Sequence, residues 1–323
     1  MVILIKDSRK VTDKINVYLF KTNDDAMKLV KLLYLILLFP VFARGITFTP
    51  GVENTEWQLE PSIFGCKFKQ PIPTYGFGTF FKEAGEELIF YLETNYNQMK
   101  TGNASLVIEA TEWKSNVLTS NLGPVKVKDT RLPVKVESFR SDRMMAELYG
   151  GMAPTITADA MYESDQIRVQ LNPTRFRLYY NDYLACVAGL LPVNFKQVER
   201  VTLPFDISQD ELNIAQKQQL KLIATYVLAD PLVSGIYLDG HTDSDGTRYH
   251  NRRLSEKRVA KAADYLISQN VDPEIITSRY HGERYPIASN DTVSGRAQNR
   301  RITVRLERIE DQPGDPLAKH PVF

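Results

Sequence analysis

The chain has 323 residues, with 40 Lys and Arg against 39 Asp and Glu. A hydrophobic fraction of 43% and a charged fraction of 24% are typical of folded domains, and the length is enough for two domains that each bury a core. The balanced charge argues against a nucleic-acid-binding protein, which needs a basic excess to neutralise phosphates. The 2 cysteines are too few for a disulfide-rich scaffold or for a zinc site made of cysteine alone.

The first 43 residues predict a leader that is not part of the fold. A short basic stretch begins at Met27, the apolar run LLYLILLFPVF follows, and Ala43 offers a small residue for cleavage. This order is typical of a secretory signal peptide over residues 27–43, with an uncleaved membrane anchor as the alternative. Residues 1–26 are polar, and we interpret them as an over-extended reading frame ahead of a true start at Met27.

The two cysteines, Cys66 and Cys186, would enter an oxidising compartment after export, where they are expected to pair. The bridge would close a loop of about 120 residues and contribute roughly 4–5 kcal/mol in the chain-entropy account. Two buried free thiols are the alternative. Neither cysteine directly follows the apolar run, which argues against a lipoprotein.

Residues 44–195 predict an antiparallel, β-rich domain. Three segments show a period-two alternation: EELIFYLET (86–94), DQIRVQLN (165–172) and RFRLYY (175–180). A short helix that carries Cys186 is expected over 182–190. No P-loop, HExxH or GxSxG motif occurs in this region, so its sequence predicts neither an enzyme nor a metal site.

Residues 196–310 predict a second domain, in which strands alternate with helices. The Pro-rich residues 311–323 predict a frayed tail. Strands are expected over four segments: 198–205, 235–240, 277–281 and 301–309. One helix is expected to begin at an S-x-x-E capping box formed by Ser208 and Glu211, and a second helix is expected through 252–268. This βαβαββ order predicts an α/β sandwich with the helices on one face of a mixed sheet, so the chain as a whole is a two-domain α+β protein.

The segment LDGHTDSDGTRYHNRRLSEKRVA (238–260) carries the candidate site. A strand ends at Gly240, a polar loop follows with Asp243, and the next helix offers Arg258. Loops between a strand and a helix are common ligand sites, because free N–H groups point outward there. One carboxylate and one guanidinium that face the same pocket suit a zwitterionic ligand.

Three other interpretations of this segment stay open. Asp243 and Arg258 could pair with each other as a structural salt bridge. His241 with Asp243 could indicate a metal, but no third ligand accompanies them in the sequence. A catalytic role for Asp243 with Asp245 or Glu256 lacks a nucleophile.

Four motifs of this second region resemble the OmpA-like peptidoglycan-binding domain over about 110 residues: PFD (204–206), GHTDSDG (240–246), LSEKRV (254–259) and NDTVSGRAQNRR (290–301). The resemblance implies non-covalent binding of meso-diaminopimelate in the stem peptide of the cell wall, with Asp243 on its ammonium and Arg258 on its carboxylate. It further implies contributions to the pocket from Phe205, Asp206, His241, Thr242 and Leu254, an additional reach from Arg301, and a structural role for Asn299. No cofactor is expected, and His250 departs from the Asn that usually follows Tyr249.

Two longer segments, SIFGCKFKQPIPTYGFGTFF (62–81) and YNDYLACVAGLLPVNFKQVERVTLPFD (180–206), resemble the MotY family of flagellar motor proteins. This resemblance runs from about residue 46 to 309 and implies a periplasmic component of the T ring around the flagellar basal body. It implies stator proteins, basal-body ring proteins and a partner T-ring protein as partners, and a disulfide between Cys66 and Cys186. Two alternatives remain: a general envelope-integrity protein that tethers the envelope to peptidoglycan, and a wall-processing enzyme with a wall-binding domain.

Overall fold

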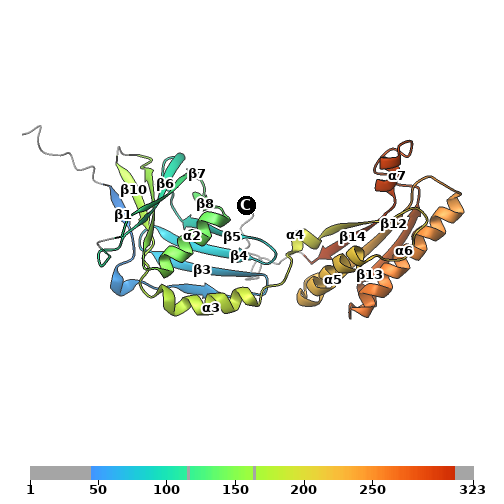
Figure 1. The fold of residues 1–323 in the computed structure, drawn as a ribbon, viewed down its shortest axis with the longest axis horizontal. Helices are drawn as coiled ribbons and strands as arrows, with labels where there is room; N and C mark the ends of the chain where they lie inside the picture. The colour runs from blue at the N-terminus through green and yellow to red at the C-terminus, as the bar shows by residue number, and fades with distance from the viewer. Residues whose placement is uncertain (1–44, 115–116, 163–164, 310–323) are drawn as a thin grey trace, which may run out of the picture.

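The structure, a computed structural model, describes residues 45–114, 117–162 and 165–309. Its elements surround two hydrophobic cores, one with buried residues from Trp57 to Tyr183 and one from Val193 to Leu306. The two groups of elements lie one after the other along the long axis of the molecule (Figure 1). The expected leader segments (1–26 and 27–43) and the tail (311–323) lie outside the described residues.

The N-terminal domain is built on one long sheet. Its strands are β1 (Ile46–Phe48), β2 (Gln58–Glu60), β3 (Gly65–Ile72), β4 (Gly76–Glu83), β5 (Leu88–Thr94), β6 (Gly102–Glu109), β7 (Ser120–Val127), β8 (Val134–Val136), β9 (Ala153–Asp159) and β10 (Gln166–Gln170). They lie in the order β1-β10-β9-β6-β7-β8-β5-β4-β3-β2. Every pairing is antiparallel except that of β1 with β10. The predicted antiparallel, β-rich domain is confirmed.

Two helices and a 3₁₀ turn, η1 (Val52–Asn54), complete this domain. Helix α2 (Ser138–Tyr149) packs against β5 and β9, and α3 (Phe176–Ala188) packs against β2 and β3. The core between α3 and the sheet is aromatic, because the Trp57 ring centroid lies 4.9 Å from both Phe68 and Phe176. The sequence prediction did not include α2.

The segment RFRLYY (175–180), predicted as a strand, forms the first half of α3, so this prediction was wrong. The buried or half-buried rings of Phe176, Tyr180 and Tyr183 are four and three residues apart, which places them on one face of a helix. Leu178, which the strand prediction grouped with them, is 72% exposed. The apolar residues therefore fit a period of 3.6 as well as a period of two over this short length.

The predicted disulfide between Cys66 and Cys186 is present in the structure. It joins the start of β3 to the last turn of α3, and its Cα atoms lie 6.1 Å apart. The bond therefore fixes α3 to the sheet across a sequence separation of 120 residues.

The C-terminal domain is a four-stranded sheet covered by helices α5 (Ile214–Ala229) and α6 (Arg248–Ser268) on one face (Figure 1). Its strands are β11 (Arg200–Pro204), β12 (Val233–His241), β13 (Ile276–Gly282) and β14 (Arg301–Arg308). Their order is β11-β14-β12-β13, with β12 and β13 parallel and the other pairs antiparallel. The predicted sandwich on a mixed sheet is confirmed. Shorter elements, none of which was predicted, are α4 (Phe195–Val198), η2 (Pro273–Ile275) and α7 (Val293–Asn299).

Helix α5 begins later than predicted. Asn213 is its N-cap: the Asn213 side chain accepts from the Gln216 N–H at 2.9 Å, and the Gln216 side chain accepts from the Asn213 N–H at 2.7 Å. The predicted capping box of Ser208 and Glu211 was wrong, since Ser208 has a left-handed backbone (φ 57°) and Glu211 pairs with Lys261. Residues 206–212 are thus left as a loop beside the candidate site.

The two domains meet through aromatic side chains. The Tyr226 ring of α5 lies 5.8 Å from Phe64 of the N-terminal domain, and 5.9 Å from Phe195 of α4 in its own domain. The guanidinium of Arg308, at the end of β14, lies 5.0 Å from the Phe195 ring and forms an ion pair with Asp230 at 3.1 Å. Among the residues that the structure describes, no helix is long and apolar enough to cross a membrane.

Candidate functional site

The predicted site lies where β12 ends and α6 begins. Gly240 allows the strand to lie close to the helix, because a Cβ there would come within 2.6 Å of Val259 Cγ2 and 2.7 Å of the Ser255 carbonyl oxygen. Thr247 then caps α6 by accepting from the His250 N–H at 3.2 Å. This close strand–helix packing brings the loop with Asp243 next to the first turn of α6, where Asn251 donates to the Asp243 carbonyl.

Arg258 of α6 is fully enclosed, with 0% of its surface exposed. Its Nε donates to the Gln209 carbonyl at 2.6 Å, its Nη1 to the His241 carbonyl at 3.3 Å and its Nη2 to the Asp206 carbonyl at 3.0 Å. The guanidinium carbon lies 4.7 Å from the centroid of the Phe205 ring. Because a guanidinium carries five N–H donors, two of them remain for another acceptor.

Burial lowers the pKa of Arg258 to about 10, and the nearby Asp243 carboxylate opposes this shift. The guanidinium therefore stays charged at neutral pH. The carbonyl groups that accept from it carry no formal charge, so the positive charge is solvated by dipoles and not neutralised by them.

Asp243 does not form an ion pair with Arg258. It pairs instead with Arg300, whose Nη1 lies 2.9 Å from Asp243 Oδ2, and both side chains are nearly buried at 8% and 11% exposed. Arg300 Nε also donates to the Phe205 carbonyl at 3.1 Å. From the residues that the structure describes, the other carboxylate oxygen, Oδ1, accepts only a long 3.3 Å hydrogen bond, from the Asp245 N–H.

The other predicted residues surround these two groups to different degrees. Phe205 and Thr242 are buried, Leu254 is half-buried and Asp206 is exposed. The Thr242 hydroxyl donates to the Asp243 carbonyl at 2.9 Å, which fixes the loop. Phe205 and Asp206 contact Arg258 through the aromatic ring and the main-chain carbonyl.

His241 and Arg301 face each other across β12 and β14. The His241 ring is buried, stacks on His281 at 4.9 Å and leaves its Nδ1 without a hydrogen bond. Burial first, and then the charges of Arg301 and His281, lower the pKa of His241 to about 4. Arg301 donates to the carbonyls of Tyr285 and Asn299, and it makes no hydrogen bond or ion pair with Asp243.

Two residues that hold the loop were missed by the sequence analysis. Arg300 stands one position before Arg301, and Asn251 of α6 donates to the Asp243 carbonyl at 3.3 Å and to Glu283 Oε2 at 2.7 Å. The only sequence signal was the Asn-Arg-Arg run itself, which does not say which arginine faces Asp243. Asn299, expected to be structural, is buried and accepts from the N–H groups of Ile287 and Ala288.

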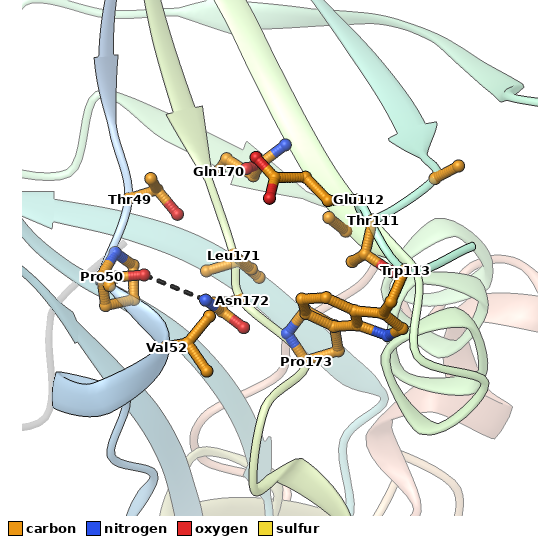
Figure 2. Close-up of a pocket in the computed structure, with 13 residues that line it drawn as sticks. Thr49, Pro50, Val52, Thr111, Glu112, Trp113, Gln170, Leu171, Asn172 and Pro173 are labelled. Carbon is orange, nitrogen blue, oxygen red and sulfur yellow. Dashed lines mark hydrogen bonds between the residues drawn. The ribbon is translucent and has the colours of Figure 1, made fainter. Parts of the chain in front are cut away.

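No group of three or more His, Cys, Asp or Glu side chains suited to a metal occurs in the described part of the chain. A separate cavity of about 380 Å³ lies in the N-terminal domain, between the loops after β1, β6 and β10. Figure 2 shows the Asn172 amide bonded to the Pro50 carbonyl there, and the distance is 3.0 Å; the exposed Trp113 is also part of the lining. Gln170 is likewise engaged, with Glu109 and Thr155, so the amides of this cavity hold the protein's own chain.

Comparison with known proteins divides the chain in the same way. Residues 48–192 match the MotY N-terminal domain and residues 204–300 match the OmpA family. The sodium-type flagellar protein MotY of Vibrio parahaemolyticus is 26% identical over 276 residues, which are 84% of this chain and 93% of that protein.

Other relatives match over a shorter length. Outer membrane protein A of Bordetella avium is 37% identical over 115 residues, which are 36% of this chain and 59% of that protein. The solved C-terminal domain of Helicobacter pylori MotB is 22% identical, with a TM-score of 0.32, over 34% of this chain and 86% of that one. The chain therefore joins a MotY N-terminal domain to a domain of the OmpA family.

Proposed function

We propose that this protein is a component of the bacterial flagellar motor that anchors the motor to the cell wall by binding peptidoglycan non-covalently. The observation that carries the proposal is the joining of the two matched domains in one chain, with similarity to a flagellar MotY protein along 84% of the chain. In the finer form of the proposal, the protein lies in the periplasm as part of the T ring. Its N-terminal domain then associates with basal-body ring proteins, and the ring holds stator complexes.

The ligand in this proposal is the diaminopimelate residue of the stem peptide, whose side-chain end carries an ammonium and a carboxylate. Asp243 Oδ1, which has only one long hydrogen bond, accepts from the ammonium. The two N–H groups that Arg258 does not use inside the protein donate to the carboxylate. Because Arg258 is enclosed by the carbonyls of residues 206 and 209, the loop that carries them moves when the ligand enters.

The role in this proposal is mechanical and not catalytic. A stator that pushes on a rotor needs a reaction against a fixed structure, and the wall provides one. A single weak site is enough, because many copies in a ring raise the effective concentration for each further contact.

Binding to purified sacculi tests the wall contact. We expect Asp243→Ala and Arg258→Ala each to reduce co-sedimentation with sacculi, because each leaves a ligand charge unpaired. Asp264→Ala on α6, exposed and without an ion pair among the described residues, is the matched control. Equal co-sedimentation of all variants would contradict this site.

A strain that lacks the gene tests the motor role. We expect filaments to be present in electron micrographs while the cells do not swim, with swimming restored by the gene on a plasmid. Normal swimming would instead favour the envelope-bracing function, which the similarity of part of the chain to outer membrane protein A also supports.

A further inference from the structure

A cavity of the C-terminal domain lies beside the site already described. It has a volume of about 200 Å³ and is formed by the start of α6 and the end of β13. Three arginines, two tyrosines and one glutamate dominate its lining: Arg248, Arg252, Arg284, Tyr249, Tyr280 and Glu283. None of these residues belongs to the predicted diaminopimelate site.

The cavity carries a net positive charge, and most of its arginine side chains have no close acidic partner in the described part of the chain. The side chains of Arg252 and Arg284 form no hydrogen bond or ion pair with any residue that the structure describes. Arg248 is 89% exposed and reaches Glu283 only at 3.4 Å. With three guanidinium groups against one carboxylate, the cavity favours an anionic ligand.

The tyrosines add a flat apolar surface to this charge. Tyr249 is 77% exposed and Tyr280 is 36% exposed. Neither ring stacks on another aromatic ring within the described ranges. The C–H face of a sugar ring is apolar while its hydroxyl groups lie at the rim, so an exposed tyrosine beside arginines matches both parts of a saccharide.

One side chain separates this cavity from Asp243. The Asn251 amide nitrogen lies 3.3 Å from the Asp243 carbonyl oxygen and 2.7 Å from Glu283 Oε2, so those two oxygens are within about 6 Å of each other. In a stem peptide, a glutamate with a free carboxylate precedes diaminopimelate, and one alanine joins that glutamate to the muramyl sugar. Because Asn251 contacts both the Asp243 loop and Glu283 of the cavity lining, the residues next to diaminopimelate in such a peptide lie within reach of this cavity.

We propose that this cavity binds the sugar-proximal part of the same muropeptide, with the free glutamate carboxylate on Arg252 and Arg284 and the muramyl sugar on Tyr249 and Tyr280. The inference rests on the proposed function, because the ligand is oriented by diaminopimelate at Asp243. It adds that the protein recognises more of the wall than one amino acid. Glycan-linked stem peptides then bind more tightly than free ones, and amidation of the glutamate weakens binding.

Titration of the full chain with defined muropeptides tests this inference, with binding followed by NMR. The ligands are the disaccharide tripeptide with a free glutamate carboxylate, its amidated form, and the free tripeptide. We expect the acid form of the disaccharide tripeptide to bind about tenfold more tightly than the amidated form, as for one charge-assisted contact. We expect the double variant Arg252→Gln with Arg284→Gln to remove that difference and to leave the affinity for the amidated form unchanged.

Further variants separate the sugar contact from general charge attraction. Tyr249→Ser with Tyr280→Ser is expected to remove the advantage of the disaccharide tripeptide over the free tripeptide. Arg200→Gln, an exposed arginine on the opposite edge strand, is the control and should change neither ratio. Equal affinities of acid and amidated ligands in the unmodified protein would overturn the inference while leaving the proposed function intact. Failure of every ligand to bind would overturn the proposed function itself.

Discussion

The buried ion pair between Asp243 and Arg300 allows the loss of unfolding free energy to be predicted for variants that remove either charge. Removing one partner leaves the other charge nearly buried and without its counter-ion, which typically costs 3–5 kcal/mol. When its partner is removed, Asp243 still accepts from the Asp245 N–H, and Arg300 still donates to the Phe205 carbonyl. We therefore expect each loss of stability to lie near the lower limit of this range. Asp243→Asn and Arg300→Gln are therefore each expected to lower the free energy of unfolding of the C-terminal domain by about 3 kcal/mol.

The double variant should be no less stable than either single variant. With both charges replaced by amides, no uncompensated charge remains, and the two amides can hydrogen-bond to each other. We therefore expect a coupling free energy of about 3 kcal/mol between Asp243 and Arg300. The exposed pair of Arg253 and Glu256 is the control, and we expect less than about 0.5 kcal/mol for its coupling.

Unfolding in urea is best followed by hydrogen exchange of the amides of β12 and β14. Both tryptophans, Trp57 and Trp113, belong to the N-terminal domain, so their fluorescence does not report on this pair. Additive effects of Asp243→Asn and Arg300→Gln would refute the argument, because they would mean that the two charges do not interact in the folded protein.

Three further predictions concern stability. Replacing both Cys66 and Cys186 by Ser removes a link across 120 residues, so we expect the N-terminal domain to lose up to about 5 kcal/mol; an unchanged urea midpoint in tryptophan fluorescence would contradict this. Because burial lowers the pKa of His241 to about 4, the unfolded chain binds a proton first as the pH falls. Stability should therefore be full above pH 6.5 and fall by up to about 3 kcal/mol toward pH 4, and His241→Gln should flatten that dependence. Gly240→Ala should cost about 1–3 kcal/mol because its Cβ would meet α6 at 2.6 Å, whereas Gly51→Ala, with no atom within 4 Å, should be near neutral in thermal unfolding.

The sequence was sufficient for the strands whose alternation runs over enough residues. DQIRVQLN (165–172) forms β10, because Ile167 and Val169 face the core while their neighbours do not. RFRLYY (175–180) failed because six residues satisfy a period of two and a period of 3.6 equally well. Its Phe176 packs on Phe68 of β3, and Tyr183 of the same helix stacks on Phe68, and no local pattern contains these tertiary contacts.

The start of α5 shows a competition between two similar signals. Both S-x-x-E at 208 and N-x-x-Q at 213 can form a capping box. The second is used because the carbonyls of residues 206 and 209 accept hydrogen bonds from Arg258, which holds that segment out of a helix. The choice between the signals therefore depends on a residue 45 or more positions away, and it is not visible locally.

The position of the candidate site could be predicted from the sequence, but the ion pairs and hydrogen bonds within it could not. The motifs place Asp243 and Arg258 close together, and the structure does so through the packing of Gly240 on α6. The pairing of Asp243 with Arg300 depends on where β14 begins. Arg301 is the first strand residue and lies opposite His241, whereas Arg300 precedes the strand and turns toward Phe205 and Asp243. Two adjacent arginines thus have different roles because Arg300 is the C-cap of α7 and Arg301 is the first residue of β14.

The position of the site at one end of the sheet gives the proposed anchoring role a physical basis. Strand β12 begins at Val233 opposite Arg308, whose partner Asp230 accepts from Tyr226, the residue that meets Phe64 of the N-terminal domain, and it ends at His241, two residues before Asp243. Its 9 residues span roughly 25 Å, and β14 pairs with it antiparallel along this length. If a wall ligand binds Asp243 as proposed, a load between that ligand and the N-terminal domain acts along the strands and not across them. Hydrogen bonds between strands that are loaded in this direction share the force, because they must break together, whereas bonds loaded across the strands would break one after another. The ends of the same two strands thus connect the proposed ligand site to the domain contact by a direct and mechanically resistant path.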